Sequence, residues 1–210
     1  MKYLGKPAGM WALFAGSFEK HLTVEFDLTA GQAKDVAARA KKKYREIIAK
    51  LPEFDKRDRF EMNIVNCAML AAFILCMPQR PDIKTLTDYY AAAMMTPTMK
   101  AFCRASGKKK FTPKDIEGMK ATAKLRAGDR NPYSWSMDFF EYENGSGYEA
   151  RFTTCGICTL MQVLGLYDLT PALCHFDYTM SDAGGASDFV REYTLASGGP
   201  YCDCGYHKKQ

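Results

Sequence analysis

Apolar residues in the first half of the chain recur at steps of three and four, the period of an amphipathic helix. The clearest case runs from Thr29 to Leu51, where lysine, arginine and glutamate occupy the intervening positions. A second helix is predicted from Asp58 to Met77, and it is apolar on nearly all sides, which indicates a buried helix. Further helices are predicted over residues 83–105, with a break or kink at Pro97, and from Thr112 to about Gly128.

The hydrophobic period changes after residue 130. From Ser134 to Glu143, aromatic and polar residues alternate with a period of two, which is typical of a strand with one buried face. Residues 144–147, Asn-Gly-Ser-Gly, form a turn signal, and residues 148–153 return as a partner strand. This part of the sequence therefore predicts a β-hairpin.

The remainder of the chain completes the predicted fold. Residues 155–178 are interpreted as two helices separated by Gly165. Two more strands are predicted over residues 189–195 and 201–207, on either side of a glycine-rich turn. Together these elements predict a single α+β domain over residues 1–210, with a helical part at 1–128 packed on an antiparallel ββααββ part at 129–210.

Composition and charge narrow the class of protein. With 210 residues, 47% of them hydrophobic, the chain can bury a core without cross-links. The net charge of +5 comes from separate lysine runs at 41–43, 108–110 and 208–209, which do not form one nucleic-acid face. The apolar segment 8–15 is interrupted by glycine and is barely long enough for the apolar core of a secretory signal, which we therefore do not expect. The apolar segment 64–77 is too short to span a bilayer. We therefore expect a cytoplasmic protein that binds neither nucleic acid nor membrane; the sequence leaves its oligomeric state open.

The chain contains eight cysteines. In a reducing compartment such residues are core, catalytic or metal-bound rather than paired as disulfides. Those in the helical half, Cys67, Cys76 and Cys103, are interpreted as ordinary buried residues. The other five lie in the C-terminal part: Cys155, Cys158, Cys174, Cys202 and Cys204.

Three kinds of chemistry fit these five thiols. One is a zinc or iron–sulfur site, although two matched Cys-x-x-Cys knuckles are missing. Its ligands would be Cys155, Cys158, Cys174 and Cys202. A second is a thioredoxin-type dithiol at Cys155-Gly-Ile-Cys158, which lacks the usual βαβ setting. The third is a nucleophile, because the free amides and dipole of a helix N-terminus stabilise a thiolate at Cys155. No cofactor is required by this third interpretation.

Carboxylates accompany the thiols in the same part of the sequence. Cys174 and Asp177 are three residues apart on a predicted helix and therefore share a face. On the last strand, Asp203 faces away from Cys202, so that only one of the two can line a given cavity. His175 points away from the Cys174 face and is interpreted as a structural side chain.

A set of short motifs runs through this part of the chain: Cys155-x-x-Cys158, Leu164-Gly165-Leu166, Pro171-Ala-Leu-Cys174-x-x-Asp177-Tyr178, Arg191-Glu-Tyr-Thr194-Leu195-Ala196-x-Gly198-Gly199 and Cys202-Asp203. Over roughly residues 130 to 206, their order resembles the L-2-amino-thiazoline-4-carboxylic acid hydrolase family. That family usually ends in Cys-Asp-Phe-Arg, where this chain has Cys-Asp-Cys-Gly. If the family arginine binds a substrate carboxylate, Arg151 or Arg191 is the expected replacement.

The resemblance implies a hydrolase acting on the carbon–nitrogen bonds of a small cyclic amidine. Its reaction opens a five-membered ring bearing a carboxylate and gives a carbamoyl-cysteine type product. On this hypothesis Asp177 binds the amidinium nitrogens and Arg191 the carboxylate, while Cys155, or else Cys174, attacks the central carbon. Water activated by a carboxylate is the non-covalent alternative. The expected site residues are Cys155, Cys174, Asp177 and Asp203 for catalysis and Arg191, Thr194 and Cys202 for substrate binding.

The order of helices followed by a sheet also resembles, more loosely, the 4-vinyl-reductase-like domains, which act as small-molecule sensors or carriers. On that interpretation the cysteines line a closed pocket or hold a metal, and no turnover occurs. The two interpretations differ in the site. A hydrolase needs an open cavity containing Asp177 and Arg191, whereas a carrier pairs these two with each other or with backbone.

Overall fold

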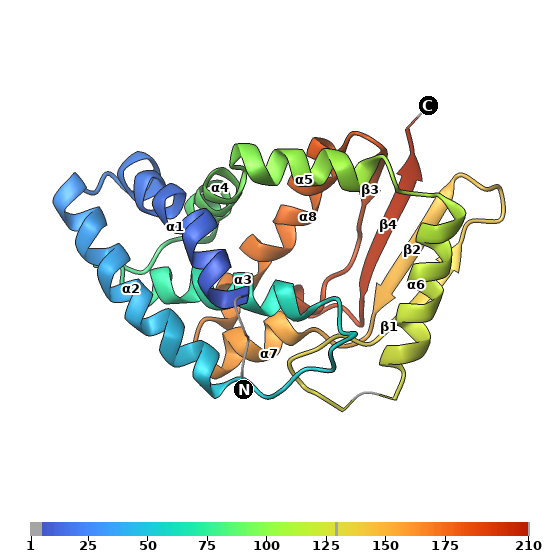
Figure 1. Cartoon of the computed structure of the whole chain (residues 1–210), viewed down its shortest axis with the longest axis horizontal. Helices are drawn as coiled ribbons and strands as arrows, with labels where there is room; N and C mark the ends of the chain where they lie inside the picture. The colour runs from blue at the N-terminus through green and yellow to red at the C-terminus, as the bar shows by residue number, and fades with distance from the viewer. Residues whose placement is uncertain (1–5, 129, 210) are drawn as a thin grey trace.

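The computed structural model describes residues 6–128 and 130–209. Eight α-helices, most of them in the N-terminal half, and one four-stranded antiparallel sheet in the C-terminal part make up the described chain. Figure 1 shows helices α1 and α2 at one end of the molecule and the sheet at the other, with α8 between them. The predicted α+β class is therefore confirmed.

Six helices form the N-terminal part of the described chain: α1 (Lys6–Glu25), α2 (Ala30–Lys50), α3 (Glu61–Ile74), α4 (Ile83–Met94), α5 (Pro97–Gly107) and α6 (Pro113–Arg126). Thr29 caps α2 through a reciprocal pair of hydrogen bonds with Gln32, which fixes the predicted start of this helix. α1 was not predicted, because Gly9 and Gly16 interrupt its apolar pattern.

The helical segment predicted over residues 83–105, with a break or kink at Pro97, consists of two helices. Thr96 caps α5 by accepting a hydrogen bond from the amide of Met99, and Pro97 occupies the first turn. Because proline cannot donate the bond that would continue α4, the predicted interruption is a complete break.

Helix α3 lies in the centre of the helical part, and α1, α2 and α7 pack against it (Figure 1). Almost all of its side chains are buried, including Cys67, as its uniformly apolar sequence indicated. Trp11 of α1 stacks on Phe73 of α3 with ring centroids 5.6 Å apart. No helix in the described ranges has both the length and the apolar character needed to cross a membrane.

The C-terminal part contains β1 (Met137–Glu141), β2 (Gly147–Phe152), α7 (Gly156–Val163), the 3₁₀ turn η1 (Tyr167–Leu169), α8 (Thr170–Gly184), β3 (Ser187–Val190), the 3₁₀ turn η2 (Leu195–Ser197) and β4 (Cys202–Lys208). The strand order is β1-β2-β4-β3, with every neighbouring pair antiparallel. The cysteine-bearing strand β4 is therefore internal to the sheet.

Strand β3 ends earlier than the sequence predicted. Residues 189–195 were expected to be extended, but the strand stops at Val190. The carboxylate of Asp203 accepts hydrogen bonds from the amides of Glu192 and Tyr193, at 2.9 and 2.6 Å. These bonds replace strand pairing, so the chain leaves the sheet after Val190.

The two faces of the sheet differ in character. The inner face, toward the helices, carries the buried side chains of Tyr148, Ala150, Phe189, Cys202 and Cys204. Helix α8 packs against β3, and α6 packs against β1, on the inner side (Figure 1). Because side chains alternate along β4, Asp203 lies on the outer face, as predicted.

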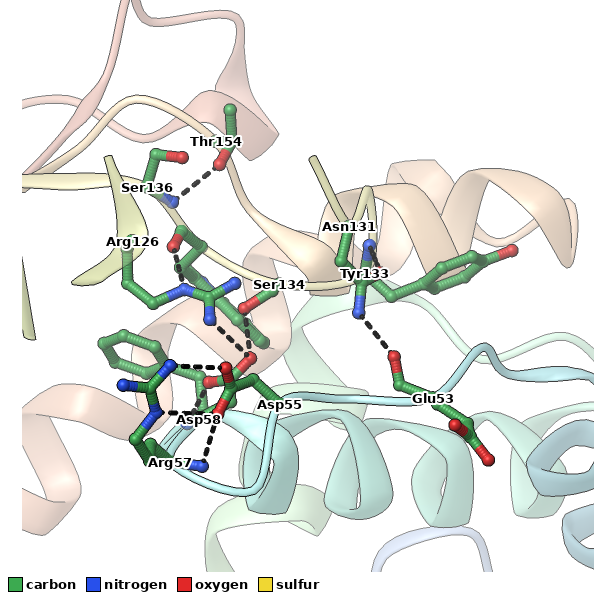
Figure 2. Close-up of polar contacts among 12 residues, drawn as sticks. Glu53, Asp55, Arg57, Asp58, Arg126, Asn131, Tyr133, Ser134, Ser136 and Thr154 are labelled. Atoms are coloured by element: carbon green, nitrogen blue, oxygen red, sulfur yellow. Dashed lines mark hydrogen bonds and ion pairs between the residues drawn. The ribbon is translucent and has the colours of Figure 1, made fainter. Parts of the chain in front are cut away.

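A buried polar cluster joins the helical part to the hairpin (Figure 2). The guanidinium of Arg126, 1% exposed, donates to the carbonyl of Trp135 at 3.2 Å and lies 3.4 Å from the Asp58 carboxylate. Asp58 also accepts hydrogen bonds from the Ser134 hydroxyl, at 2.5 Å, and from the amide of Phe60. Asp58 therefore forms a turn, and α3 begins after it rather than at the predicted residue.

Helices α5 and α8 cross in close contact. A side chain at Gly107, the last residue of α5, would overlap the backbone carbonyl of Gly184 at the end of α8. Glycine at position 107 is therefore required by the distance between the two backbones.

Candidate active site

Cys155 occupies the N-cap position of α7, as the sequence predicted. Its side chain makes no capping hydrogen bond to the first turn. Interaction with the Cys158 thiol, and then with the backbone amides of Cys158 and Ile157, nevertheless lowers the pKa of Cys155 below its usual value, although burial acts in the opposite direction.

The Cys158 thiol is the proton donor in this pair. Its hydrogen bond to Cys155 and its burial raise its pKa far above the usual range. Cys155 therefore ionises first, while Cys158 stays protonated and stabilises the thiolate.

The glycine between the two cysteines is fixed by packing. A side chain at Gly156 would overlap the backbone carbonyl of Tyr133, in the segment before the hairpin. The N-terminus of α7 is thereby held against this segment, and the position of Cys155 follows from it.

The remaining cysteines of the site are ordinary protonated thiols. Burial raises the pKa of Cys174, on α8, to about 12, and it raises the pKa values of Cys202 and Cys204 on β4. A thiolate at Cys155 raises the pKa values of Cys174 and Cys202 further, so these cysteines lie within electrostatic range of Cys155. Cys202 also accepts a hydrogen bond from the amide of Leu195 at 3.2 Å.

The cysteines form neither disulfides nor a ready metal-ligand set. All eight are free thiols. Within residues 6–128 and 130–209, no group of three or more His, Cys, Asp or Glu side chains is arranged to hold a metal ion. The alternative ligand set of Cys155, Cys158, Cys174 and Cys202 is therefore not assembled as a metal site in this arrangement.

Asp177 of α8 and Arg191, just after β3, form an ion pair. The Nη1 of Arg191 lies 2.7 Å from Oδ2 of Asp177, and its Nη2 donates to the carbonyl of Cys174 at 2.6 Å. The Arg191 side chain is 6% exposed and that of Asp177 is 34% exposed. Burial raises the pKa of Asp177, although Arg191 opposes this shift. This ion pair is the arrangement we expected of a carrier, since the two groups are not both free.

The two members of the pair line different hollows in the molecule. Asp177 lines a cavity of about 280 Å³ between the inner face of the sheet and helices α5, α6 and α8, which we call the main cavity. Its charged and phenolic lining residues are Arg59, Lys110, Asp115, Tyr148, Asp177 and Tyr206.

Arg191 lines a smaller surface hollow of about 210 Å³, together with Cys174 and Thr194. Three of the predicted site residues therefore lie together in this hollow. The Thr194 hydroxyl is already engaged, because it caps η2 by accepting from the amide of Ser197 at 3.1 Å.

Two predicted site groups lie on the outer face of the sheet, away from the main cavity. Both oxygens of Asp203 accept backbone hydrogen bonds, and Arg151, opposite it on β2, pairs with Glu149 at 2.7 Å. Gly205 lies on the same face, against Tyr142 and Val190. An arginine at position 205 would therefore point outward, so the Cys-Asp-Cys-Gly ending removes no cation from the main cavity.

Sequence reasoning missed two cations of the main cavity. Arg59 precedes α3, and Lys110 ends a lysine run that was interpreted as solvated. Lys108 and Lys109 are indeed exposed, but Lys110 is half-buried. The sequence feature that distinguishes Lys110 from the other two lysines is its position next to Phe111, an aromatic residue directly before the helix cap Thr112.

The comparison with protein families decides the assignment. The model of the L-2-amino-thiazoline-4-carboxylic acid hydrolase family matches residues 62–206, which is more than half of the chain. The chain belongs to this family. Searches of curated proteins and of solved structures returned no match.

The match extends beyond the region in which we found family motifs. Residues 62–130 contain α3 to α6, so that these helices are part of the L-2-amino-thiazoline-4-carboxylic acid hydrolase domain. All the cysteines of the site, and Lys110, Asp115 and Asp177 of the main cavity, fall inside the matched range, whereas Arg59 precedes it.

Proposed function

We propose that this protein is a hydrolase that opens a small cyclic amidine bearing a carboxylate, of the 2-amino-thiazoline-4-carboxylate type. The observation that carries this proposal is the position of Asp177. Its carboxylate lines the main cavity, and its negative charge raises the pKa of Cys155, so the two groups lie within electrostatic range of each other. Cys155 lines neither of the two hollows described above, so the covalent route requires the ligand to extend from the main cavity to the start of α7.

Asp177 holds the amidine part of the substrate. Its Oδ2 atom is bound to Arg191, while Oδ1 accepts no hydrogen bond from the described residues. An amidinium N–H can donate to Oδ1 in a charge-assisted hydrogen bond, which is stronger than a bond between neutral groups. Arg191 keeps the orientation of the carboxylate fixed while Oδ1 accepts the ligand.

The covalent step begins with attack of the Cys155 thiolate on the central amidine carbon. The bond between this carbon and the ring sulfur then breaks, so the ring opens at a carbon–sulfur bond and not at the carbon–nitrogen bond that the family resemblance implied. The sulfur leaves as a thiolate and takes up a proton from solvent. The product of this step is an isothiourea linked to Cys155, which contains all the atoms of the substrate. Water then adds to the same carbon and expels the Cys155 thiolate, which leaves a urea, the carbamoyl-cysteine type product.

A carboxylate whose pKa is raised by burial suits the second half of this reaction. Asp177 accepts a proton from the attacking water more readily than an exposed aspartate does. In the non-covalent alternative the same carboxylate activates water for direct attack on the ring. Asp203 does not serve in this role, because both its oxygens bind backbone amides on the outer face.

Acid quench followed by mass spectrometry tests the covalent route. Under single-turnover conditions with 2-amino-thiazoline-4-carboxylate, we expect an adduct on Cys155 with the mass of the intact substrate. Cys155→Ser should abolish both the adduct and turnover, whereas Cys174→Ser, which retains Cys155, should form the adduct. If no adduct forms and both serine variants remain active, the covalent route is wrong and the water route stands.

A carrier or sensor is the second candidate, and the Arg191–Asp177 ion pair favours it. In that case the protein binds the amidine without consuming it. Isothermal titration together with product analysis separates the two candidates: binding with no product after prolonged incubation identifies a carrier, and multiple turnovers identify the hydrolase. Under either candidate, the proposed partner is a small molecule.

A further inference from the structure

Lys110, which is half-buried, presents its ammonium group to the main cavity. Its Nζ lies 3.3 Å from the ring centroid of Tyr206 and 5.3 Å from that of Tyr148. The faces of these rings are electron-rich and attract a cation, which offsets part of the cost of removing it from water. Among the described residues, Lys110 forms no ion pair with a carboxylate.

The backbone explains why Lys110 points inward. Phe111 has a φ of 62°, a left-handed conformation that is unfavourable for a bulky residue. Its amide donates to Oδ2 of Asp115 at 2.9 Å, and the Tyr148 hydroxyl donates to the same oxygen at 3.1 Å. Asp115, the carboxylate nearest to Lys110 in the sequence, is therefore bonded to Phe111 and Tyr148. It stabilises the turn that directs Lys110 into the main cavity.

Arg59 lines the same cavity. Its Nη1 contacts the sulfur of Met119 at 3.3 Å, and within the described ranges it has no carboxylate partner. Two cations thus line one cavity without paired anions, while Asp177, a carboxylate with a free oxygen, lines another part of it. Lys110 and Asp177 still act on each other's pKa, which places them within electrostatic range.

We propose that Lys110, assisted by Arg59, binds the carboxylate of the ligand in the main cavity. The ligand class is then a small zwitterion, with a planar cation on Asp177 and a carboxylate on Lys110. This inference rests on the proposed function, and it assigns the carboxylate to a different cation from Arg191, the one expected from sequence. Arg191 instead keeps its role as the partner of Asp177.

Titration with two probes tests this assignment. The probes are 2-amino-thiazoline-4-carboxylate and 2-aminothiazoline, which lacks the carboxylate. The wild-type protein should bind the first roughly tenfold or more tightly than the second, as a charge-assisted bond requires. Lys110→Met should lose this preference, and Lys109→Met, which removes an exposed neighbour, should retain it. Circular dichroism checks that both variants are folded.

A Lys110→Met variant that keeps the full preference for the carboxylate-bearing probe would overturn the assignment. If the wild-type protein hydrolyses 2-amino-thiazoline-4-carboxylate, the proposed function then stands and only the carboxylate assignment fails.

If neither probe binds and no turnover occurs, the proposed function fails, and a second readout then decides the carboxylate site. Reductive methylation of Lys110, followed by peptide mass spectrometry, is measured with and without L-thiazolidine-4-carboxylate, a small carboxylate with no amidine. Protection of Lys110 but not of Lys109 supports an anion site. Equal modification with and without this probe overturns it.

Discussion

At the scale of single residues, Cys155 differs from the neighbouring thiols in the direction of its pKa shift. The pKa of Cys155 is lowered, chiefly by the Cys158 thiol and two backbone amides, whereas those of Cys158, Cys174 and Cys202 are raised. Reactivity toward electrophiles depends on the thiolate fraction, so we expect Cys155 to be the most reactive of these four cysteines.

Alkylation with iodoacetamide near neutral pH should therefore modify Cys155 first. Cys158→Ala removes the strongest of the stabilising bonds, and we expect it to slow this reaction by roughly tenfold. Cys174→Ala serves as the matched control, because Cys174 donates no hydrogen bond to Cys155, and it should leave the rate nearly unchanged. Peptide mapping by mass spectrometry measures the rates. Preferential labelling of Cys174 or Cys202 would contradict the assignment.

The charge of Lys110 makes ligand binding depend on pH. Burial is the main cause that lowers the pKa of Lys110 to about 8, and the charge of Arg59 acts in the same direction. Asp115, Asp177 and Cys204 raise this pKa and oppose the shift. Because the protonated amine binds the carboxylate, affinity is retained below this pKa and lost above it. Well above pH 8, we expect the affinity for 2-amino-thiazoline-4-carboxylate to fall by about tenfold per pH unit.

Isothermal titration across this pH range measures the effect, with 2-aminothiazoline as the control ligand. Since that ligand has no carboxylate, its affinity should not show the Lys110 transition. In a Lys110→Met variant, the affinity for 2-amino-thiazoline-4-carboxylate should lose this transition, and the affinity for 2-aminothiazoline should be unaffected. If the affinity of Lys110→Met for 2-amino-thiazoline-4-carboxylate fell in the same way at alkaline pH, the transition would belong to another group.

Residue-level inference from the sequence succeeded where the cause was local. The place of Cys155 at a helix start follows from the hairpin before it and the apolar period after it. The inward direction of Lys110 does not, because it depends on a left-handed backbone at Phe111 that Asp115 and Tyr148 hold from elsewhere. A run of three lysines gives no sign that its last member is half-buried and faces a cavity.

At the scale of elements, the cluster of Arg126, Asp58 and Ser134 connects α6, the turn before α3 and the hairpin (Figure 2). The Asp58 and Arg126 side chains are 0% and 1% exposed, so removing one charge leaves the other buried with reduced compensation. Loss of one partner from such a pair is strongly destabilising.

Asp58→Ala should therefore lower the free energy of unfolding by about 3–5 kcal/mol. Urea denaturation followed by circular dichroism measures the change. Asp55→Ala is the matched control from the same turn, because Asp55 pairs with Arg57 in an exposed position and should have no clear effect. Equal stability of the two variants would show that the buried cluster contributes nothing specific.

The starts of α5 and α6 could be recognised from the sequence, because Thr96-Pro97 and Thr112-Pro113 place a capping threonine before a first-turn proline. Thr170-Pro171 also marks the start of α8, but there Thr170 is the first helical residue and its side chain makes no cap. The end of β3 was not predictable, because residues 191–195 have the composition of a strand. What removes them from the sheet is the Asp203 carboxylate, which is distant in sequence and adjacent in space. A pattern that describes neighbours along the chain cannot contain such a contact.

At the scale of the whole molecule, the α+β class follows from the change in hydrophobic period near residue 130. The main cavity does not follow from it, because Arg59, Lys110 and Asp177 come from three separate parts of the chain. Only the packing of α5, α6 and α8 over the inner face of the sheet brings them to one place (Figure 1). Of these three residues, only Asp177 was predicted from the sequence, because it lies within a family motif.

The contact between Gly107 and Gly184 has a consequence for ligand choice. Both residues line the main cavity, and their backbones touch, so that the separation of α5 and α8 is fixed by main chain. A rotating side chain can make room for a larger ligand, but a backbone cannot. A substrate analogue with a bulky ring substituent directed at these glycines meets a rigid wall. We expect the protein to sort its ligands by size at this wall, independently of how it sorts them by charge.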